Sequence, residues 1–439
     1  MYAKIDPDSA DCASSALDLF YIPGTNVGVL NVIFKEFLTL NPVTSSPYHF
    51  SIAPTQQLID LSQTTIESVW TMEISGDNGA TWAGVTDADD VSVVQMFGAT
   101  WMRNVKLTAA GREISNSNNL HAYKVIFDTL LNYDKAAKES HLGVSCFYPD
   151  GVDVNAANGP GFLARKGRIT NRAHAHFIHN LDVDLFNQPR YFINNIPLDI
   201  EIHPNSVEFL TQAPNFVAGT NLARFTLRDL RLMAAFPTLS DSMMVSINGT
   251  LERRPAIYHI RRADMKTVFL EAGRTEINVN IFTDYVPRSL TMAMVATNAY
   301  NGDYTLSPFN FQPFGIQKHQ VEVNGVRYPT VDREMNIAAN DYTWAYYELM
   351  RNLGYNFNNG SCGITLEQFR NGATIFNWDL TANNKNDTCF ELMKRGTTSY
   401  HARFRAAIPA GGVTMIFKGD YDAIIKVDGS RSVHTDRAI

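Results

Sequence analysis

Residues 69–74 read Val-Trp-Thr-Met-Glu-Ile, and residues 289–294 read Ser-Leu-Thr-Met-Ala-Met. Both are short runs rich in β-favouring residues, which is typical of strands. Alignment of Thr71 with Thr291 places the two runs 220 residues apart. One such match is weak evidence, because short strand patterns coincide often. Further matches in the same order would indicate a repeated unit, since ordered self-similarity is the sequence signature of a repeat.

Four further matches follow in that order. They join the hairpins that begin at Val105 and Val321, the helical stretches that end at 131–133 and 353–355, residues 178–182 with 375–379, and the strands around Asp229 and Asp420. Their offsets are 216, 222, 197 and 191 residues. The offset falls along the chain, so the first unit has longer insertions, for which the Asn/Gly-rich stretch Pro149–Gly167 is the candidate. We therefore predict an N-terminal arm (1–19), two units of one kind (20–238 and 239–430) and a C-terminal tail (431–439).

Each unit is predicted to consist mainly of short strands separated by turn residues. The predicted strands are Phe34–Leu40, Val69–Ile74, Val91–Phe97, Met102–Leu107, His174–Phe186, Tyr191–Ile202, Arg224–Phe236, Met265–Phe282, Leu290–Ala296, Gln320–Tyr328, Thr374–Leu380, Ser399–Ile408 and Val413–Val427, with a hairpin over Val105–Ile114 that turns near Gly111. About eight strands per unit, with one helix in a crossover, favour a jelly roll, in which two sheets pack face to face. The fold class is thus all-β, with two tandem eight-stranded jelly-roll sandwiches and a short helix inserted in each.

Two stretches have the periodicity of an amphipathic helix. The first is Asn119–Tyr133, which Asn118 or Asn119 could cap at its N-terminus. The second is Asn340–Leu353, which Asn340 or Asp341 could cap and which Gly354 should end.

Composition narrows the class of protein. The chain has 439 residues, of which 45% are hydrophobic and only 18% charged, and its formal charge is −7. Such a chain can bury large cores, which excludes wholesale disorder. The 37 Asn residues equal all Lys and Arg together and favour a loop-rich β protein with a mildly acidic surface.

Targeting segments are not recognised in the sequence. No run of about 18 apolar residues predicts a membrane span. The first fifteen residues lack the basic and apolar regions of a secretory signal. The cysteines at 12, 146, 362 and 389 fit neither a zinc site nor a disulfide framework, so we interpret them as free thiols in a reducing compartment.

No catalytic signature is found, and the most tempting cluster is His174, His176 and His179. Jelly rolls that bind metal use an HxH pair on one strand face, but they also need a carboxylate soon after it. Here Asn180 and Leu181 follow. We therefore interpret the histidines as a polar strand face and predict no metal site.

Two groups of acidic residues could have either a functional or a purely structural role. Asp182 and Asp184 share a strand face and could do acid–base chemistry, but a solvated strand end or a hydrogen bond to a neighbouring loop is favoured. Asp150, Asp153 and Asn155 could surround a calcium ion, but their spacing is not that of an EF-hand, and a polar loop is favoured. We predict no catalytic, cofactor-binding or metal-binding residues.

Two basic groups could contact phosphate. One is Arg253-Arg254 with Arg261-Arg262, and the other comprises Arg165, Lys166, Arg168 and Arg172. The first thirty residues contain one Lys, so the chain has no basic arm of the kind that binds packaged nucleic acid. Solvated or interfacial salt bridges are the favoured interpretation.

Long blocks of the sequence, in the correct order, resemble the double jelly-roll major capsid proteins of Maverick/Polinton elements and related eukaryotic DNA viruses. The blocks are ALDLFYIPGT (16–25), ISNSNNLHAYKVIFDTLLNY (114–133), LDVDLFNQPRYFINNIPLDIEI (181–202), RRADMKTVFLEA (261–272), VPRSLTMAMVATNAYNGDYTLSPFNFQP (286–313) and ITLEQFRNGATIFNWDL (364–380). The stretch Phe50–Ser62 departs from the pattern, because it is longer than expected between the first strands.

The resemblance implies a non-enzymatic shell subunit. Such proteins form homotrimers whose six lobes give a pseudo-hexagonal capsomer, and capsomers tile an icosahedral shell around double-stranded DNA. A single jelly-roll penton or minor capsid protein usually fills the vertices. It further implies residence in the virion capsid, assembly inside the host cell, and no sequence-specific DNA binding.

The alternative is a jelly-roll protein that binds or processes glycans. Processing would need convergent carboxylates in a cleft, and binding would need exposed aromatic platforms. The five Trp residues, at 70, 82, 101, 344 and 378, stand mostly in apolar contexts, so we predict that they belong to the core.

Overall fold

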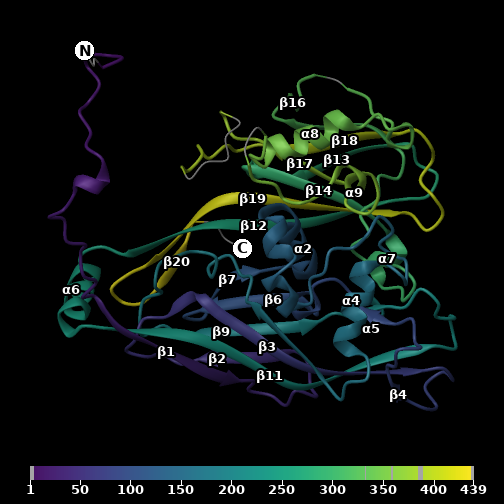
Figure 1. Cartoon of the computed structure of the whole chain (residues 1–439), viewed down its shortest axis with the longest axis horizontal. Coiled ribbons are helices and arrows are strands. Elements are labelled where there is room, and N and C mark those ends of the chain that lie inside the picture. The colour runs from purple at the N-terminus through teal and green to yellow at the C-terminus, as the bar shows by residue number, and fades with distance from the viewer. Residues whose placement is uncertain (1–3, 332, 357–358, 384–388, 437–439) are drawn as a thin grey trace.

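The computed structural model describes residues 4–331, 333–356, 359–383 and 389–436. Its strands form two β-sandwiches that lie against each other, and the segment before the first strand extends away from both (Figure 1). Residues 1–3 of the predicted arm and 437–439 of the predicted tail lie outside the described residues.

The first sandwich has two antiparallel sheets. One has the order β1-β11-β3-β4, with β8 also paired to β3, and the other has the order β2-β9-β6-β7. Their bounds are β1 Val29–Leu38, β2 Tyr48–Ile52, β3 Asp60–Ser75, β4 Ala83–Gly84, β6 Met102–Ala109, β7 Arg112–Asn116, β8 Ala175–Asn180, β9 Leu198–Pro204 and β11 Leu222–Leu239. A separate two-stranded ribbon pairs β5 (Ser92–Val93) with β10 (Thr211–Gln212).

The second sandwich repeats this order. One sheet runs β12-β19-β14-β17, with β20 also paired to β19, and the other runs β13-β18-β15-β16. The bounds are β12 Ala256–Leu270, β13 Glu276–Phe282, β14 Ser289–Ala296, β15 Ile316–Val323, β16 Val326–Tyr328, β17 Ile375–Asp379, β18 Thr398–Phe404, β19 Val413–Val427 and β20 Val433–Thr435. Leaving aside β4, β5, β10 and β20, the described part of each sandwich has eight strands in one topology.

All five sequence matches fall on equivalent elements. The opening pair lies in β3 and β14, the hairpins are β6–β7 and β15–β16, and the last two matches are β8 with β17 and β11 with β19. The helical match is α2 (His121–Asn132) with α8 (Thr343–Asn352), and each helix lies between the hairpin and the following strand. Sheet membership does not fix exact boundaries, so the limits at residues 19, 238 and 430 stay predictions.

Some predicted strands have different limits. Met265–Phe282 is two strands, because Gly273 takes a left-handed turn at φ 86° between them. Val91–Phe97 contains only β5, since Met96 is left-handed and begins a helical turn. His174–Phe186 ends as a strand at Asn180, and the strand predicted from Tyr191 begins only at Leu198.

The helix caps also differ from the prediction. Asn118 and Asn119 are left-handed residues of the turn before α2, and Leu120 takes the cap position without a side-chain hydrogen bond. Tyr342 takes that position before α8. Gly354 follows the end of α8 with φ 80°, as expected.

Further helices occur besides the one predicted in each unit. Two are long: α4 (Pro160–Ile169), which starts with Pro160 inside the predicted Asn/Gly-rich insertion, and α6 (Asp241–Leu251), which follows Ser240 near the predicted seam. The short ones are η1 Ser15–Leu17, α1 Phe97–Thr100, α3 Lys135–Lys138, η2 His141–Ser145, α5 Val207–Leu210, α7 Thr297–Asn301, η3 Ile337–Ala339 and α9 Leu366–Arg370. Among the described residues, no helix is both long and apolar enough to cross a membrane.

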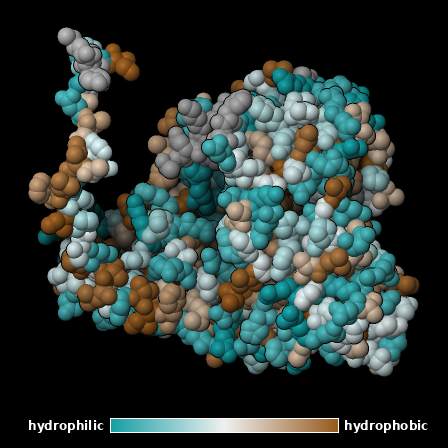
Figure 2. Space-filling model, viewed as in Figure 1, coloured by the Kyte–Doolittle hydropathy of each residue, from teal (hydrophilic) through white to brown (hydrophobic). Residues whose placement is uncertain are grey.

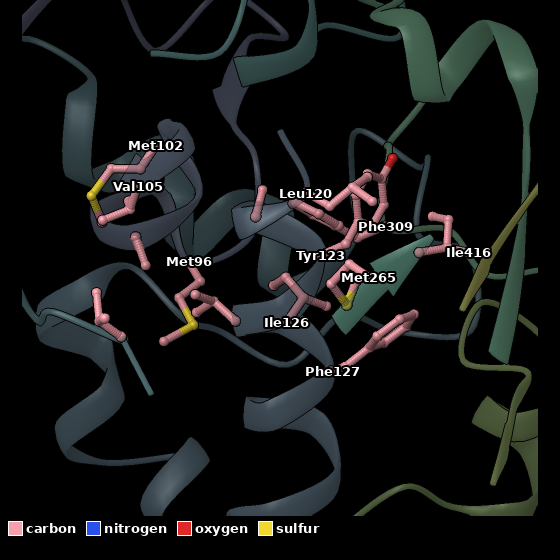
Figure 3. Close-up of a cluster of buried hydrophobic side chains, with 14 of the residues drawn as sticks. Met96, Met102, Val105, Leu120, Tyr123, Ile126, Phe127, Met265, Phe309 and Ile416 are labelled. Atoms are coloured by element: carbon pink, nitrogen blue, oxygen red, sulfur yellow. The ribbon is translucent and has the colours of Figure 1, made fainter. Parts of the chain in front are cut away.

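The core continues from one sandwich into the other. Trp70 on β3 meets Trp101 at a ring distance of 5.4 Å, and Trp101 in turn contacts Tyr48 on the opposing sheet. Helix α2 lies between the sandwiches, where its apolar residues face Met265, Phe309 and Ile416 of the second half (Figure 3). The two sandwiches are therefore joined by packed side chains as well as by the chain itself.

Candidate functional site

The seam between the two sandwiches is built around α2. The Tyr123 ring stacks on Tyr300 at 5.7 Å and meets Phe309 edge-on at 5.6 Å. One turn later, Phe127 lies 5.4 Å from Phe311. Aromatic pairs at these distances add to the stabilisation that burial of their area provides.

The polar side of α2 carries a buried cluster of charges. Lys124 Nζ lies 2.8 Å from Asp182, 3.4 Å from Asp128 and 3.5 Å from Asp184. The Lys124 side chain is only 7% exposed, so its ammonium depends on these carboxylates.

A second lysine extends the cluster into the second sandwich. Lys418 Nζ on β19 contacts Asp128 at 2.8 Å and Asp420 at 2.7 Å. Asp184 also accepts a 3.2 Å hydrogen bond from the Ala263 backbone N–H on β12. The six side chains Lys124, Asp128, Asp182, Asp184, Lys418 and Asp420 form what we call the seam cluster, which ties the two sandwiches together.

Protonation within the seam cluster follows burial and neighbouring charge. Burial opposes ionisation of Asp182, but Lys124, His121 and the hydrogen bond from Asn187 together outweigh it and hold the pKa of Asp182 well below its usual range. For Asp184, burial dominates over Lys124, and the negative Asp182 adds to the effect, so the pKa rises to about 6. The carboxylates raise the pKa of Lys124 well above normal despite its burial. Lys124 and Asp182 are thus held charged, whereas Asp184 titrates near pH 6.

The three predicted histidines do not converge. His174 and His176 are exposed, whereas His179 donates to or accepts from Ser145 Oγ at 3.0 Å. Burial lowers the pKa of His179 to about 4. Within the described residues, no group of three His, Cys, Asp or Glu side chains has the arrangement needed for a metal ion.

The possible calcium loop is instead part of the packing. Asp150 pairs with Arg165 at 2.8 Å, and Asp153 accepts from the Asn155 backbone N–H. Asn155 Oδ1 accepts from the Ser307 N–H of the second sandwich. These side chains fix a loop across the seam, in agreement with the polar-loop interpretation.

The predicted basic groups divide between interior and surface. Arg165 is 1% exposed and donates to Val93 O, to the side-chain oxygens of Gln95 and Gln212, and to Asp150. Arg261 pairs with Asp422 at 3.4 Å, while Arg253 and Arg254 lie exposed after α6. Arg165 is therefore a structural ion rather than a phosphate ligand.

Sequence reasoning missed Lys124, Asp128 and Lys418. These residues belong to no sequence motif. The one signal in the sequence is that Lys124 and Asp128 are four positions apart in a predicted helix, where opposite charges can pair. For Asp182 and Asp184, the sequence favoured a solvated strand end or a hydrogen bond to a neighbouring loop. Asp184 instead accepts its hydrogen bond from Ala263 of strand β12, and both aspartates are buried and paired with Lys124.

An apolar surface also lies open to solvent on the first sandwich. The segment before β1 and the edge strand β1 itself contribute most of it: Leu17, Leu19, Phe20, Tyr21, Ile22, Val27, Leu30, Val32, Ile33, Phe34 and Leu38. Met243 and Val245 of α6 adjoin it, because Gly28 O accepts from the Ser240 N–H beside them. Figure 2 shows apolar residues gathered along the arm and at its junction with the body. We call this set the outer apolar surface.

The whole chain is similar to solved capsid structures. The alignment with a chain of the Sputnik virophage structure covers 100% of this chain and 94% of that chain, with a TM-score of 0.66 and 12% identity. The alignment with the mavirus major capsid protein covers 99% of this chain and 97% of that chain, with a TM-score of 0.56 and 12% identity. The fold is that of the double jelly-roll major capsid proteins.

The predicted fold class is thereby confirmed. The Faustovirus major capsid protein gives a third likeness, with a TM-score of 0.52, 8% identity and 92% of each chain covered. In sequence, an uncharacterized protein of Caenorhabditis elegans is 29% identical over 328 residues, which are 74% of this chain and 76% of that protein. No protein-family model matches the chain.

Proposed function

We propose that this double jelly-roll protein is the major capsid subunit of a shell that encloses double-stranded DNA. Three chains form a homotrimer, and its six sandwiches give a pseudo-hexagonal capsomer that tiles icosahedral faces. A single jelly-roll penton or minor capsid protein occupies the vertices, and assembly takes place inside the host cell without secretion. The role is structural and involves no catalysis.

The observation that carries the proposal is the repeated sandwich with a packed seam. Both sandwiches have the same strand order, and α2 and the seam cluster hold them together. A tile must present lobes at fixed positions, and aromatic packing and buried ion pairs across the seam supply that rigidity. The similarity to capsid proteins over the full length supports the same role.

The outer apolar surface supports self-assembly. Monomeric soluble proteins rarely expose contiguous apolar patches of large extent, and such patches mark contact sites. Among the described strands, β1 pairs with β11 alone and so forms a sheet edge. An unpaired, apolar edge invites another chain. We propose that a neighbouring copy covers this surface in the capsomer.

The glycan alternative has less support. Trp70, Trp101 and Trp378 are buried, so they form no platform for a sugar ring. Trp82 lies under Arg224 at 4.4 Å. The acidic residues that converge, in the seam cluster, are paired with Lys124 and Lys418 and serve packing.

The oligomeric state tests the proposal. Light scattering or mass photometry at micromolar concentration should give a trimer of about 147 kDa, three times the 49.1 kDa chain. Electron microscopy should show hexagonal capsomers or shells. A strictly monomeric protein in both measurements would contradict a capsid role.

A pair of matched variants tests the contact surface separately. Phe34 on β1 is 54% exposed, and Phe269 on β12 is 56% exposed. We expect Phe34→Asp to shift the mass distribution toward monomer and Phe269→Asp to leave the trimer intact. If Phe34→Asp stays trimeric, the outer apolar surface is not the trimer contact, although the capsid role could stand.

A further inference from the structure

A cavity of about 250 Å³ lies between the two sandwiches. Ile126 and Leu130 of α2 form one wall together with Phe147. Phe309, Ile364 and Ala373 of the second sandwich line the opposite wall. The cavity is therefore mainly apolar and is bounded by both halves of the chain.

The cavity contains one buried cation without a carboxylate partner. Lys138 is 5% exposed, and its Nζ donates to Leu130 O at 2.7 Å and to Cys362 O. Among the described residues, no carboxylate forms an ion pair with it. Burial lowers the pKa of Lys138 to about 8, an effect that Cys362 and Asp134 only partly offset. An ammonium has three donors, so one remains for a ligand.

The other charges that line the cavity are already compensated. Lys135 and Glu139 pair with each other at 3.6 Å at the exposed rim. Asp150 pairs with the buried Arg165. Among the described residues that line the cavity, Lys138 is thus the cation without a carboxylate partner, and burying such a charge unpaired is costly.

We propose that this cavity binds a small amphipathic anion, a medium-chain carboxylate, with its apolar chain between the sandwiches and its carboxylate on Lys138 Nζ. A dry cavity of about 150 Å³ holds benzene, with six carbons, so 250 Å³ suits about ten non-hydrogen atoms. Octanoate has that size. The carboxylate would accept a charge-assisted hydrogen bond from Lys138, and the alkyl chain would pack against the apolar walls. This inference is independent of the proposed capsid role.

Calorimetry with octanoate tests the site on the intact chain, with octan-1-ol as the uncharged probe. Octanoate should bind at one site per chain and raise the melting temperature, because it contacts both sandwiches. Lys138→Met should weaken octanoate binding about tenfold or more and change octanol binding less than threefold. Octanoate affinity should also fall above pH 8, as Lys138 loses its proton.

Two further variants separate the charge from folding defects. Lys426→Met, at an exposed position of β19 that does not line the cavity, should bind octanoate as the wild type does. Ala373→Leu should fill the cavity and abolish binding of both probes while the far-ultraviolet circular dichroism stays unchanged. Failure of octanoate to bind the wild type, or equal octanoate affinity in Lys138→Met, would overturn the proposal.

Discussion

Replacement of Lys124 by Met should loosen the seam between the sandwiches. The substitution keeps most of the apolar stem but removes the cation that Asp182, Asp184 and Asp128 share at 2.8, 3.5 and 3.4 Å. Removal of one partner from a buried ion pair costs about 3–5 kcal/mol, because the other charge stays buried without compensation. For units of about 200 residues, each kcal/mol lowers the melting temperature by about 2–4 °C. We therefore expect a decrease of about 6–20 °C at pH 7.

The pH dependence of this variant has a definite sign. Lys124 holds the pKa of Asp182 down, so Asp182 stabilises the wild type above pH 4 and loses that effect as the pH falls. The pKa of Asp184 is raised to about 6, so its ionisation costs stability as the pH rises from 4 to 6. Without Lys124, both pKa values should rise, and protonation at pH 5 should relieve the repulsion. The difference from the wild type should therefore shrink between pH 7 and pH 5.

Differential scanning fluorimetry at both pH values measures these effects, and Lys135→Met is the matched control. Lys135 is 71% exposed and pairs with Glu139 at 3.6 Å, so its loss should cost less than about 1 kcal/mol. Adding Asp184→Asn to Lys124→Met should recover part of the loss, since one buried charge disappears. A melting temperature of Lys124→Met equal to that of Lys135→Met, or strict additivity in the double variant, would refute the reasoning.

Two other buried groups give further predictions. His319 is surrounded by Trp344, Phe376 and Trp378, and burial lowers its pKa to about 3, so the wild type should lose about 2 kcal/mol through this group as the pH falls from 7 to 5. We expect urea titrations at the two pH values to show that His319→Phe lacks this decrease in the free energy of unfolding. His176→Phe, at an exposed position, should show the same decrease as the wild type. Arg165→Met should destabilise the first sandwich by about 3–5 kcal/mol in the same assay, because Asp150 stays buried without its partner. The exposed Arg172→Met should change stability by no more than about 0.5 kcal/mol, and an equal effect of both variants would contradict the structural role of Arg165.

The topology could be predicted because both halves of the chain solve the same packing problem. Strands β3 and β14 carry the opening match, and each must place apolar residues on the inner face of its sheet at the same position. The order of the matches then defines the strand order. Strand limits were less predictable, since Gly273 turns the chain between two strands and Met96 begins a helical turn, both through left-handed backbone conformations. Such conformations leave little trace in the hydrophobic pattern.

The seam could not be predicted for a different physical reason. Ion pairs such as Lys418 with Asp128 join residues 290 positions apart. No spacing rule connects them, and each looks like an ordinary surface charge in its own strand or helix. The cation–carboxylate network becomes visible only when the two sandwiches are placed against each other.

The equivalent helices α2 and α8 show how a repeated unit becomes asymmetric. In α8 the buried residues are Ala345, Leu349 and Met350, which make one apolar stripe. In α2 nine residues are buried, including Lys124, because this helix faces its own sandwich and the neighbouring one. A helix buried on several sides must either be apolar all round or pair its polar groups. The seam cluster is the second solution, so the charges of α2 mark which copy of the repeated helix lies inside the molecule.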